Sequence, residues 1–168
     1  MTSHKSGGTC CAEGHPAICR MSTLATIECE RLPASPETAV KPAVLTMPLG
    51  LLGFEEVKQY AILQNPDEQP FLWLQMSEAP KHAFLIVPPS AVVPDYRPEL
   101  SDDDVTFLQL KSPEDAVIVN IVTLRSGASS TVNLKGPIVY NRHTRIGKQV
   151  IPLNASRFTL QYPLPALA

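Results

Sequence analysis

Short apolar runs alternate with turns along most of the chain, and the runs have the patterning of strands. They are rich in β-branched and aromatic residues, which favour the pleated, half-buried surface of a sheet. The turns between them carry proline, glycine, asparagine and aspartate, whose backbone preferences interrupt strands. We predict a mainly β chain with strands at residues 21–29, 43–47, 59–63, 71–76, 82–87, 116–124, 131–135, 138–140, 147–151 and 156–162.

The stretch 131–151 shows this pattern most clearly. Gly136 and Pro137 divide its first half. Because proline has no backbone donor, it fits the start of a strand better than the middle of a central one. A polar turn from Asn141 to Arg145 then precedes the last apolar run. The stretch is therefore expected to form three short strands in a meander.

One segment has helical character. Ser101 can cap a helix whose first turn holds three aspartates, residues 102–104, and the third aspartate occupies the capping-box position. Carboxylates in a first turn also favour the positive end of the helix dipole. We predict one short helix that runs to about Leu110 and ends before Pro113.

Nine or ten short strands with one short helix predict a small barrel or a closed sandwich, because closure hides strand edges. A chain of 168 residues suffices for a single buried core. The first twenty residues are small, polar and aperiodic, as in many chain ends. We divide the chain into a disordered tail at 1–20, a β-barrel-like domain at 21–162 and a C-terminal tail at 163–168.

Composition narrows the class of protein. Seventeen prolines argue against a helical fold, since each would disrupt a helix interior by about 3 kcal/mol. The 14 basic and 16 acidic residues give a net charge of −2, without the basic field that nucleic-acid binding requires. Residues 83–87 form the longest apolar run, far below the roughly 20 residues of a membrane span. The N-terminus lacks the regions of a signal peptide, so we expect a cytoplasmic protein that binds neither nucleic acid nor membrane.

The four cysteines all lie near the N-terminus, with histidines among them. A structural zinc site usually shows two closely spaced ligand pairs, and no second pair follows here. A reduced tail without metal or cofactor is our preferred interpretation. The alternative is a zinc or redox protein that uses Cys10, Cys11, His15, Cys19 and Cys29.

No catalytic set is recognisable in the sequence. A nucleophile elbow, a phosphate-binding glycine loop and an H-E-x-x-H zinc motif are all missing. His82 lies next to a strand with no carboxylate at a fixed spacing, and His143 lies in a turn between Arg142 and Arg145, so we interpret both as exposed histidines and not as general bases. The aspartates at 102–104 could hold a metal or act in acid–base chemistry, but helix capping accounts for them. We interpret the chain as a binding protein and not as an enzyme.

Four segments together resemble the flagellar assembly factor family FliW. They are Met47–Glu55 (MPLGLLGFE), Pro70–Gln75 (PFLWLQ), Ala83–Pro89 (AFLIVPP) with a following PDY, and Thr131–Asn141 (TVNLKGPIVYN) with a later KQVI. Each motif is modest by itself, whereas their order and spacing make the match specific. The resemblance extends over about residues 21–162.

This resemblance implies a cytoplasmic, non-enzymatic regulator with a small β-barrel-like fold. Members of the family bind flagellin, and they also bind CsrA, an RNA-binding translational repressor. Once flagellin is secreted, the free factor sequesters CsrA, so that flagellin mRNA is translated. A β-domain chaperone for another secreted protein is the alternative that the same features allow.

The resemblance also suggests where partners would bind. CsrA must be basic to hold RNA, so an acidic face could attract it. We predict that contact on Glu55, Glu56, Asp95, Asp102, Asp103 and Asp104. Flagellin's terminal segments would dock as an amphipathic helix or an added strand, in an apolar groove lined by Leu51 or Phe54.

Overall fold

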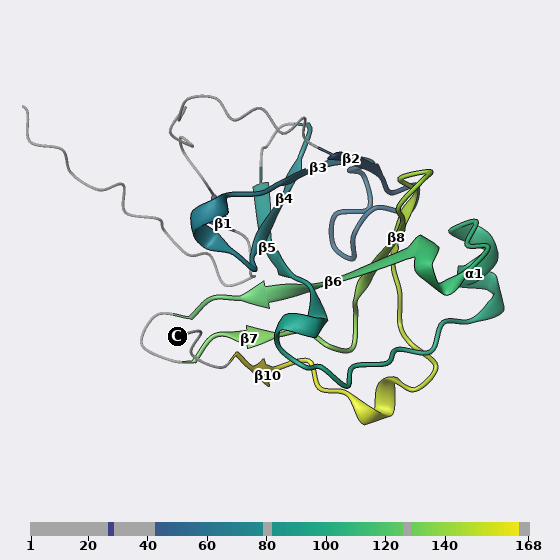
Figure 1. Ribbon diagram of the computed structural model, residues 1–168. Helices are drawn as coiled ribbons and strands as arrows, with labels where there is room; N and C mark the ends of the chain where they lie inside the picture. Colours follow the sequence, from purple (N-terminus) through teal and green to yellow (C-terminus); the bar gives the residue numbers. More distant parts are fainter. Residues whose placement is uncertain (1–26, 29–42, 79–81, 126–128, 165–168) are drawn as a thin grey trace, which may run out of the picture.

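The computed structural model describes residues 27–28, 43–78, 82–125 and 129–164. These ranges contain ten strands and one α-helix, which confirms the mainly β fold (Figure 1). The predicted tail at 1–20 and all four cysteines lie outside the described residues. The elements are β1 (Ile27–Glu28), β2 (Ala43–Thr46), β3 (Gln59–Leu63), β4 (Leu72–Met76), β5 (His82–Val87), α1 (Asp102–Phe107), β6 (Ala116–Thr123), β7 (Thr131–Val132), β8 (Ile138–Asn141), β9 (Gly147–Gln149) and β10 (Tyr162–Pro163).

The strands form one antiparallel sheet in which β6 is the hub. The main order is β10-β7-β6-β5-β4-β3-β2, while β1 pairs with β5 and β9 pairs with β8. Residues 116–119 of β6 pair with β8, residues 122–123 pair with β7, and the two residues between them pair with β5. This long strand therefore joins the β2–β5 meander to the β8–β9 hairpin.

The sheet curves back on itself at one point. Thr46 of β2 forms a single parallel bridge with Ile146, just before β9, and its N–H donates to the Arg145 carbonyl oxygen at 2.9 Å. No continuous ladder closes the sheet among the described residues. The description as barrel-like holds only in this loose sense.

Three predicted strands are clearly shorter than the sequence pattern suggests, and the first of them is β9, which ends at Gln149 and not at residue 151. β7 ends at Val132 because the Asn133 side chain accepts hydrogen bonds from the Lys135 and Gly136 N–H groups, both at 3.0 Å, and turns the chain. The prediction of a strand at 156–162 was wrong for most of these residues. A 3₁₀ turn at Ala155–Arg157 replaces its start, and pairing begins only at Tyr162.

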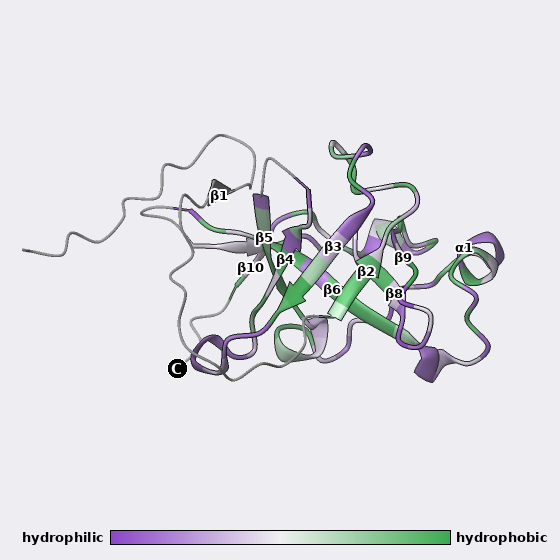
Figure 2. Cartoon of the chain, turned by 90° about the horizontal axis from the view of Figure 1, so that it is seen from above, coloured by the Kyte–Doolittle hydropathy of each residue, from purple (hydrophilic) through white to green (hydrophobic). Residues whose placement is uncertain are grey.

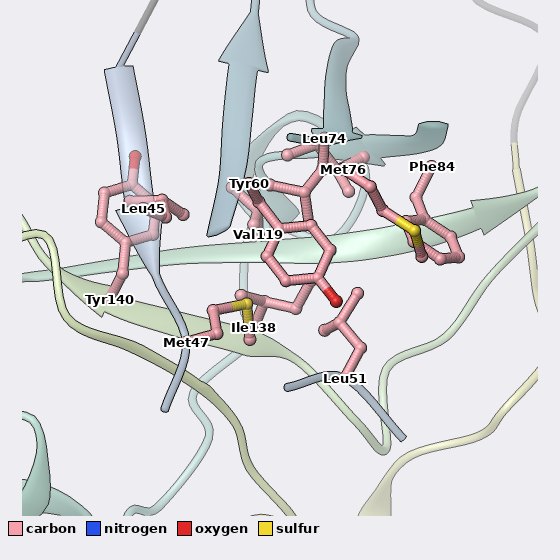
Figure 3. Close-up of a cluster of buried hydrophobic side chains, with 11 residues drawn as sticks. Leu45, Met47, Leu51, Tyr60, Leu74, Met76, Phe84, Val119, Ile138 and Tyr140 are labelled. Atoms are coloured by element: carbon pink, nitrogen blue, oxygen red, sulfur yellow. The ribbon is translucent and has the colours of Figure 1, made fainter. Parts of the chain in front are cut away.

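The buried apolar residues form three clusters. The largest gathers side chains from β2 to β5 with Ile138 and Tyr140 of β8 (Figure 3). A second lies between β5, β6, β7 and the segment that contains Val92 and Tyr96. The third is the smallest, with Leu108, Val139 and Val150 as its buried members.

Helix α1 begins as the sequence predicts, ends at Phe107 before the predicted limit of about Leu110, and is held against β8 at its C-terminal end. At its start, Ser101 accepts from the Asp104 N–H at 3.2 Å, as the sequence predicts. At its end, the Asn141 side chain of β8 donates to the carbonyl oxygens of Leu108 and Gln109 at 3.1 and 2.8 Å. The helix and β1 lie at opposite ends of the molecule (Figures 1 and 2).

Candidate functional site

The turn that follows β2 has a backbone set by two glycines. Gly50 and Gly53 have φ values of +71° and +84°, which side chains rarely adopt. A Cβ at Gly50 would lie 2.6 Å from the Glu55 Cα and 2.6 Å from the Phe54 carbonyl oxygen. The chain thus needs glycine at position 50 both for its conformation and for its space.

This turn divides its leucines between the core and the surface. Leu51 is 2 % exposed, and it lies beside the hydroxyl end of Tyr60 in the largest cluster (Figure 3). Phe54 is half-buried and packs edge-on against Phe84 at a centroid distance of 5.2 Å. By contrast Leu49 and Leu52 are 51 % and 68 % exposed. Leu49 and Leu52 are therefore accessible to an apolar partner, whereas Leu51 is buried in the core.

Two carboxylates stand next to these leucines. Glu55 and Glu56 are exposed. The Gly53 N–H donates to the Glu55 carboxylate at 2.8 Å, and this hydrogen bond lowers the pKa of Glu55 below its usual range. We call Leu49, Leu52, Glu55 and Glu56 the turn surface.

The three aspartates of α1 have different environments. Asp104 is 7 % exposed, and its carboxylate accepts from the Lys148 ammonium at 2.6 Å and from the Ser101 hydroxyl at 2.7 Å. Burial acts to raise the pKa of Asp104, but these hydrogen bonds outweigh it and the pKa is lowered. The sequence placed Asp104 in a partner contact, whereas the structure gives it an internal ion pair.

Asp102 and Asp103 remain exposed at the start of α1. Neither lies within 4.0 Å of a basic group in the part of the chain that the structure describes. We call these two residues the helix surface. Asp95 is also exposed, but it precedes Tyr96, which packs in the second cluster and belongs to another part of the molecule.

Strand β9 separates the turn surface from the helix surface. Lys148 reaches Asp104 of α1, whereas the side chain of the next residue, Gln149, accepts from the Leu52 N–H at 3.1 Å. Successive side chains of a strand point to opposite faces. Their register partners agree, because Val139 packs in the cluster of α1 and Ile138 packs in the cluster of Leu51. The predicted acidic residues therefore do not form a single patch.

The described residues contain no group of three or more potential metal ligands. The zinc or redox alternative depends on Cys10, Cys11, His15, Cys19 and Cys29, which all lie outside the described ranges. No helix in the described part of the chain is long and apolar enough to cross a membrane.

Two features of these surfaces escaped the sequence analysis. Gly50 and Gly53 signal a tight turn, but no local pattern indicates that Leu51 is the buried leucine and that Leu49 and Leu52 are exposed. The Lys148–Asp104 pair joins residues 44 positions apart. No local pattern signals such a contact.

Comparison with known proteins relates these features to a family. Residues 33–164 match the family described as FliW protein. A flagellar assembly factor FliW from Natranaerobius thermophilus is 38 % identical over 123 residues, covering 72 % of this chain and 81 % of the relative. The FliW of Syntrophus aciditrophicus is 39 % identical over 122 residues, covering 72 % and 77 %.

A solved structure agrees with these relatives. The crystal structure of a flagellar assembly factor FliW superimposes with a TM-score of 0.63 at 33 % identity, covering 71 % of this chain and 82 % of that one. Sequence and fold thus lead to the same assignment. The protein belongs to the FliW family.

Proposed function

We propose that this protein is a cytoplasmic flagellar assembly factor without enzymatic activity, which binds flagellin and sequesters the translational repressor CsrA. Membership of the FliW family carries the proposal. The relatives are flagellar assembly factors, and the similarity to this chain covers most of the length of each of them. Release from flagellin after secretion would free the protein to bind CsrA, and flagellin mRNA would then be translated.

The helix surface is our candidate for the CsrA contact. Asp102 and Asp103 are exposed carboxylates without an ion-pair partner among the described residues. CsrA has to be basic to hold RNA, and opposite charges accelerate the encounter of two proteins. Glu55, Glu56 and Asp95 remain further acidic candidates from the sequence.

The turn surface is our candidate for the flagellin contact. Leu49 and Leu52 offer exposed apolar side chains on a turn whose backbone is fixed by Gly50. A rigid apolar projection suits an amphipathic segment that orders on binding. Phe54 would support this contact from beneath, through its packing on Phe84.

A three-component titration tests the proposal. Labelled CsrA is titrated with the protein in the presence and absence of flagellin, and flagellin is titrated separately. We expect the protein to bind each partner, and excess flagellin to change the amount of CsrA bound. Binding to neither partner would refute the proposal.

Paired variants test the placement of the two contacts. Leu52→Ser should weaken flagellin binding, and Leu160→Ser is its matched control because Leu160 is 58 % exposed on another part of the chain. Replacing both Asp102 and Asp103 with asparagine should slow CsrA association, most strongly at low salt. Equal behaviour of Leu52→Ser and Leu160→Ser would move the flagellin contact elsewhere.

A further inference from the structure

Tyr140 of β8 carries a hydroxyl group that the fold leaves without a partner. The residue is 8 % exposed in the largest core cluster, and its hydroxyl has no hydrogen bond among the described residues. Its ring lies beside Leu45 of β2, and its hydroxyl points away from Met47 and Leu51 (Figure 3). The Tyr60 hydroxyl also lacks a partner, but it is enclosed in the core. Because a largely buried hydroxyl without a hydrogen bond is costly, that of Tyr140 is a ready donor for a ligand.

Two exposed arginines follow Tyr140 in the turn between β8 and β9. Side chains alternate between the faces of a strand. Asn141 faces α1, so Arg142 follows on the face of Tyr140. Arg145 folds back, because its N–H donates to the Asn141 carbonyl oxygen at 2.9 Å, and its own carbonyl oxygen accepts from Thr46 of β2. Both arginines therefore lie at the end of β8 where the Tyr140 ring meets β2.

The positive charges of this turn are not neutralised within the described chain. Neither Arg142 nor Arg145 has a carboxylate within 4.0 Å in the described ranges. The carboxylate of Asp115 instead accepts from His143 at 3.1 Å and from two backbone N–H groups. Burial raises the pKa of Tyr140, and the charges of the two arginines oppose this rise, with no contribution from a described carboxylate. The surroundings of the hydroxyl are therefore positive.

The backbone of Arg145 has an unusual conformation. Its φ is +60°, in the left-handed region that glycine and asparagine occupy at lower cost than arginine. Backbone strain of this kind is found most often at binding and catalytic sites. Arginine at this position has no advantage for the turn itself, so its guanidinium group is the feature that distinguishes it.

We propose that the Tyr140 hydroxyl and the guanidinium groups of Arg142 and Arg145 bind a phosphate group at the β8–β9 turn. Guanidinium groups pair with phosphate oxygens through two parallel hydrogen bonds, and a hydroxyl donates one more. Two unpaired positive charges match a phosphate dianion better than a single carboxylate. This site goes beyond the proposed function and requires neither of the partners proposed there.

Titration of the whole chain with inorganic phosphate tests the site, with the amide chemical shifts of residues 140–146 as the signal. We expect a saturable shift of these amides, and weaker binding of acetate, which carries one charge. O-phosphoserine distinguishes the two sources of a phosphate group. Binding tighter than that of inorganic phosphate would assign the site to a phosphorylated side chain, and the reverse order would assign it to free phosphate. No saturable response to either compound, or equal binding of acetate, would overturn the proposal.

Two variants remove single groups from the site. Tyr140→Phe and Arg145→Asn should each raise the dissociation constant for phosphate about tenfold, since each removes a hydrogen bond to a charged group. Tyr140→Phe should leave Tm unchanged, because the hydroxyl has no hydrogen bond to lose among the described residues, and asparagine tolerates the backbone conformation of Arg145. Weaker binding by these variants is thereby separated from unfolding.

Arg157→Asn is the matched control, since Arg157 is an exposed arginine on the 3₁₀ turn at Ala155–Arg157. We expect it to bind phosphate as tightly as the wild-type chain. Wild-type affinity in both Tyr140→Phe and Arg145→Asn would overturn the site. An equal loss of affinity in Arg157→Asn would also overturn it, because phosphate would then respond only to the net charge of the protein.

Discussion

Replacing Asp104 with asparagine removes the charge that holds Lys148 and leaves the size of the side chain unchanged. In the folded protein this carboxylate accepts hydrogen bonds from Lys148 at 2.6 Å and from Ser101 at 2.7 Å. The substitution would leave the Lys148 ammonium over Phe107, 5.4 Å from the ring centroid, without its anionic partner. We therefore expect α1 to be held less firmly on β9.

The exposure of the two side chains sets the expected magnitude. An exposed ion pair contributes about 0–1 kcal/mol, whereas breaking a buried pair costs about 3–5 kcal/mol. The Asp104 side chain is 10 % exposed and that of Lys148 is 26 % exposed, so this pair is intermediate. We predict a loss of about 2 kcal/mol in the free energy of unfolding at pH 7. For a chain of this length, this lowers Tm by about 4–8 °C.

Urea and thermal unfolding measure this loss, with the fluorescence of Trp73 as a signal from the only tryptophan. The pKa of Asp104 is lowered in the folded protein, so its stabilisation is present above the usual carboxyl range and is lost as pH falls through the folded pKa. The difference between wild type and Asp104→Asn should therefore shrink below about pH 4. Asp103→Asn is the control, and it should change stability by less than about 0.5 kcal/mol. Equal stabilities of Asp104→Asn and Asp103→Asn at pH 7 would refute the reasoning.

Three further predictions concern the turn after β2 and the Thr46–Ile146 bridge, where the sheet curves back on itself. Leu51→Ala should destabilise the protein by about 2–5 kcal/mol in urea unfolding, while Leu52→Ala should change stability by less than about 0.5 kcal/mol. Gly50→Ala should lower Tm more than Gly53→Ala, because a Cβ at Gly53 meets nothing within 4 Å and adds only backbone strain, about 1–2 kcal/mol. In hydrogen exchange, the Thr46 amide, which donates across the single bridge, should exchange faster than the amides of β4, which lie in a continuous ladder. Equal protection of these amides would show that the bridge is as stable as the rest of the sheet.

Local chemistry made much of the fold predictable. Runs of β-branched and aromatic residues predicted β3, β5 and β8, and Ser101 with Asp104 predicted the start of α1. The failure at 156–162 has a physical cause. Phe158 and Leu160 have strand-like side chains, but a 3₁₀ turn at Ala155–Arg157 occupies the start of the run, and only Tyr162 finds a partner strand.

The candidate site was less accessible to sequence reasoning, because burial and pairing depend on contacts between distant residues. Leu51 and Leu52 are identical in type and adjacent, yet one is 2 % and the other 68 % exposed. Asp103 and Asp104 differ in the same way, since only Asp104 faces Lys148. Which member of each pair reaches the surface follows from the packing of β8 and β9, which no local window of sequence contains.

The alternation of side chains along β9 has a consequence for genetics. Lys148 and Gln149 are encoded by consecutive codons, yet their side chains contact α1 and the Leu52 turn on opposite faces of the strand. Point mutations in these two codons would therefore perturb different surfaces and give alleles with separable phenotypes. Deleting one residue from the preceding hairpin turn would shift the strand by one position and exchange the two faces. In a mutational screen, this short segment should tolerate substitutions more readily than changes of length.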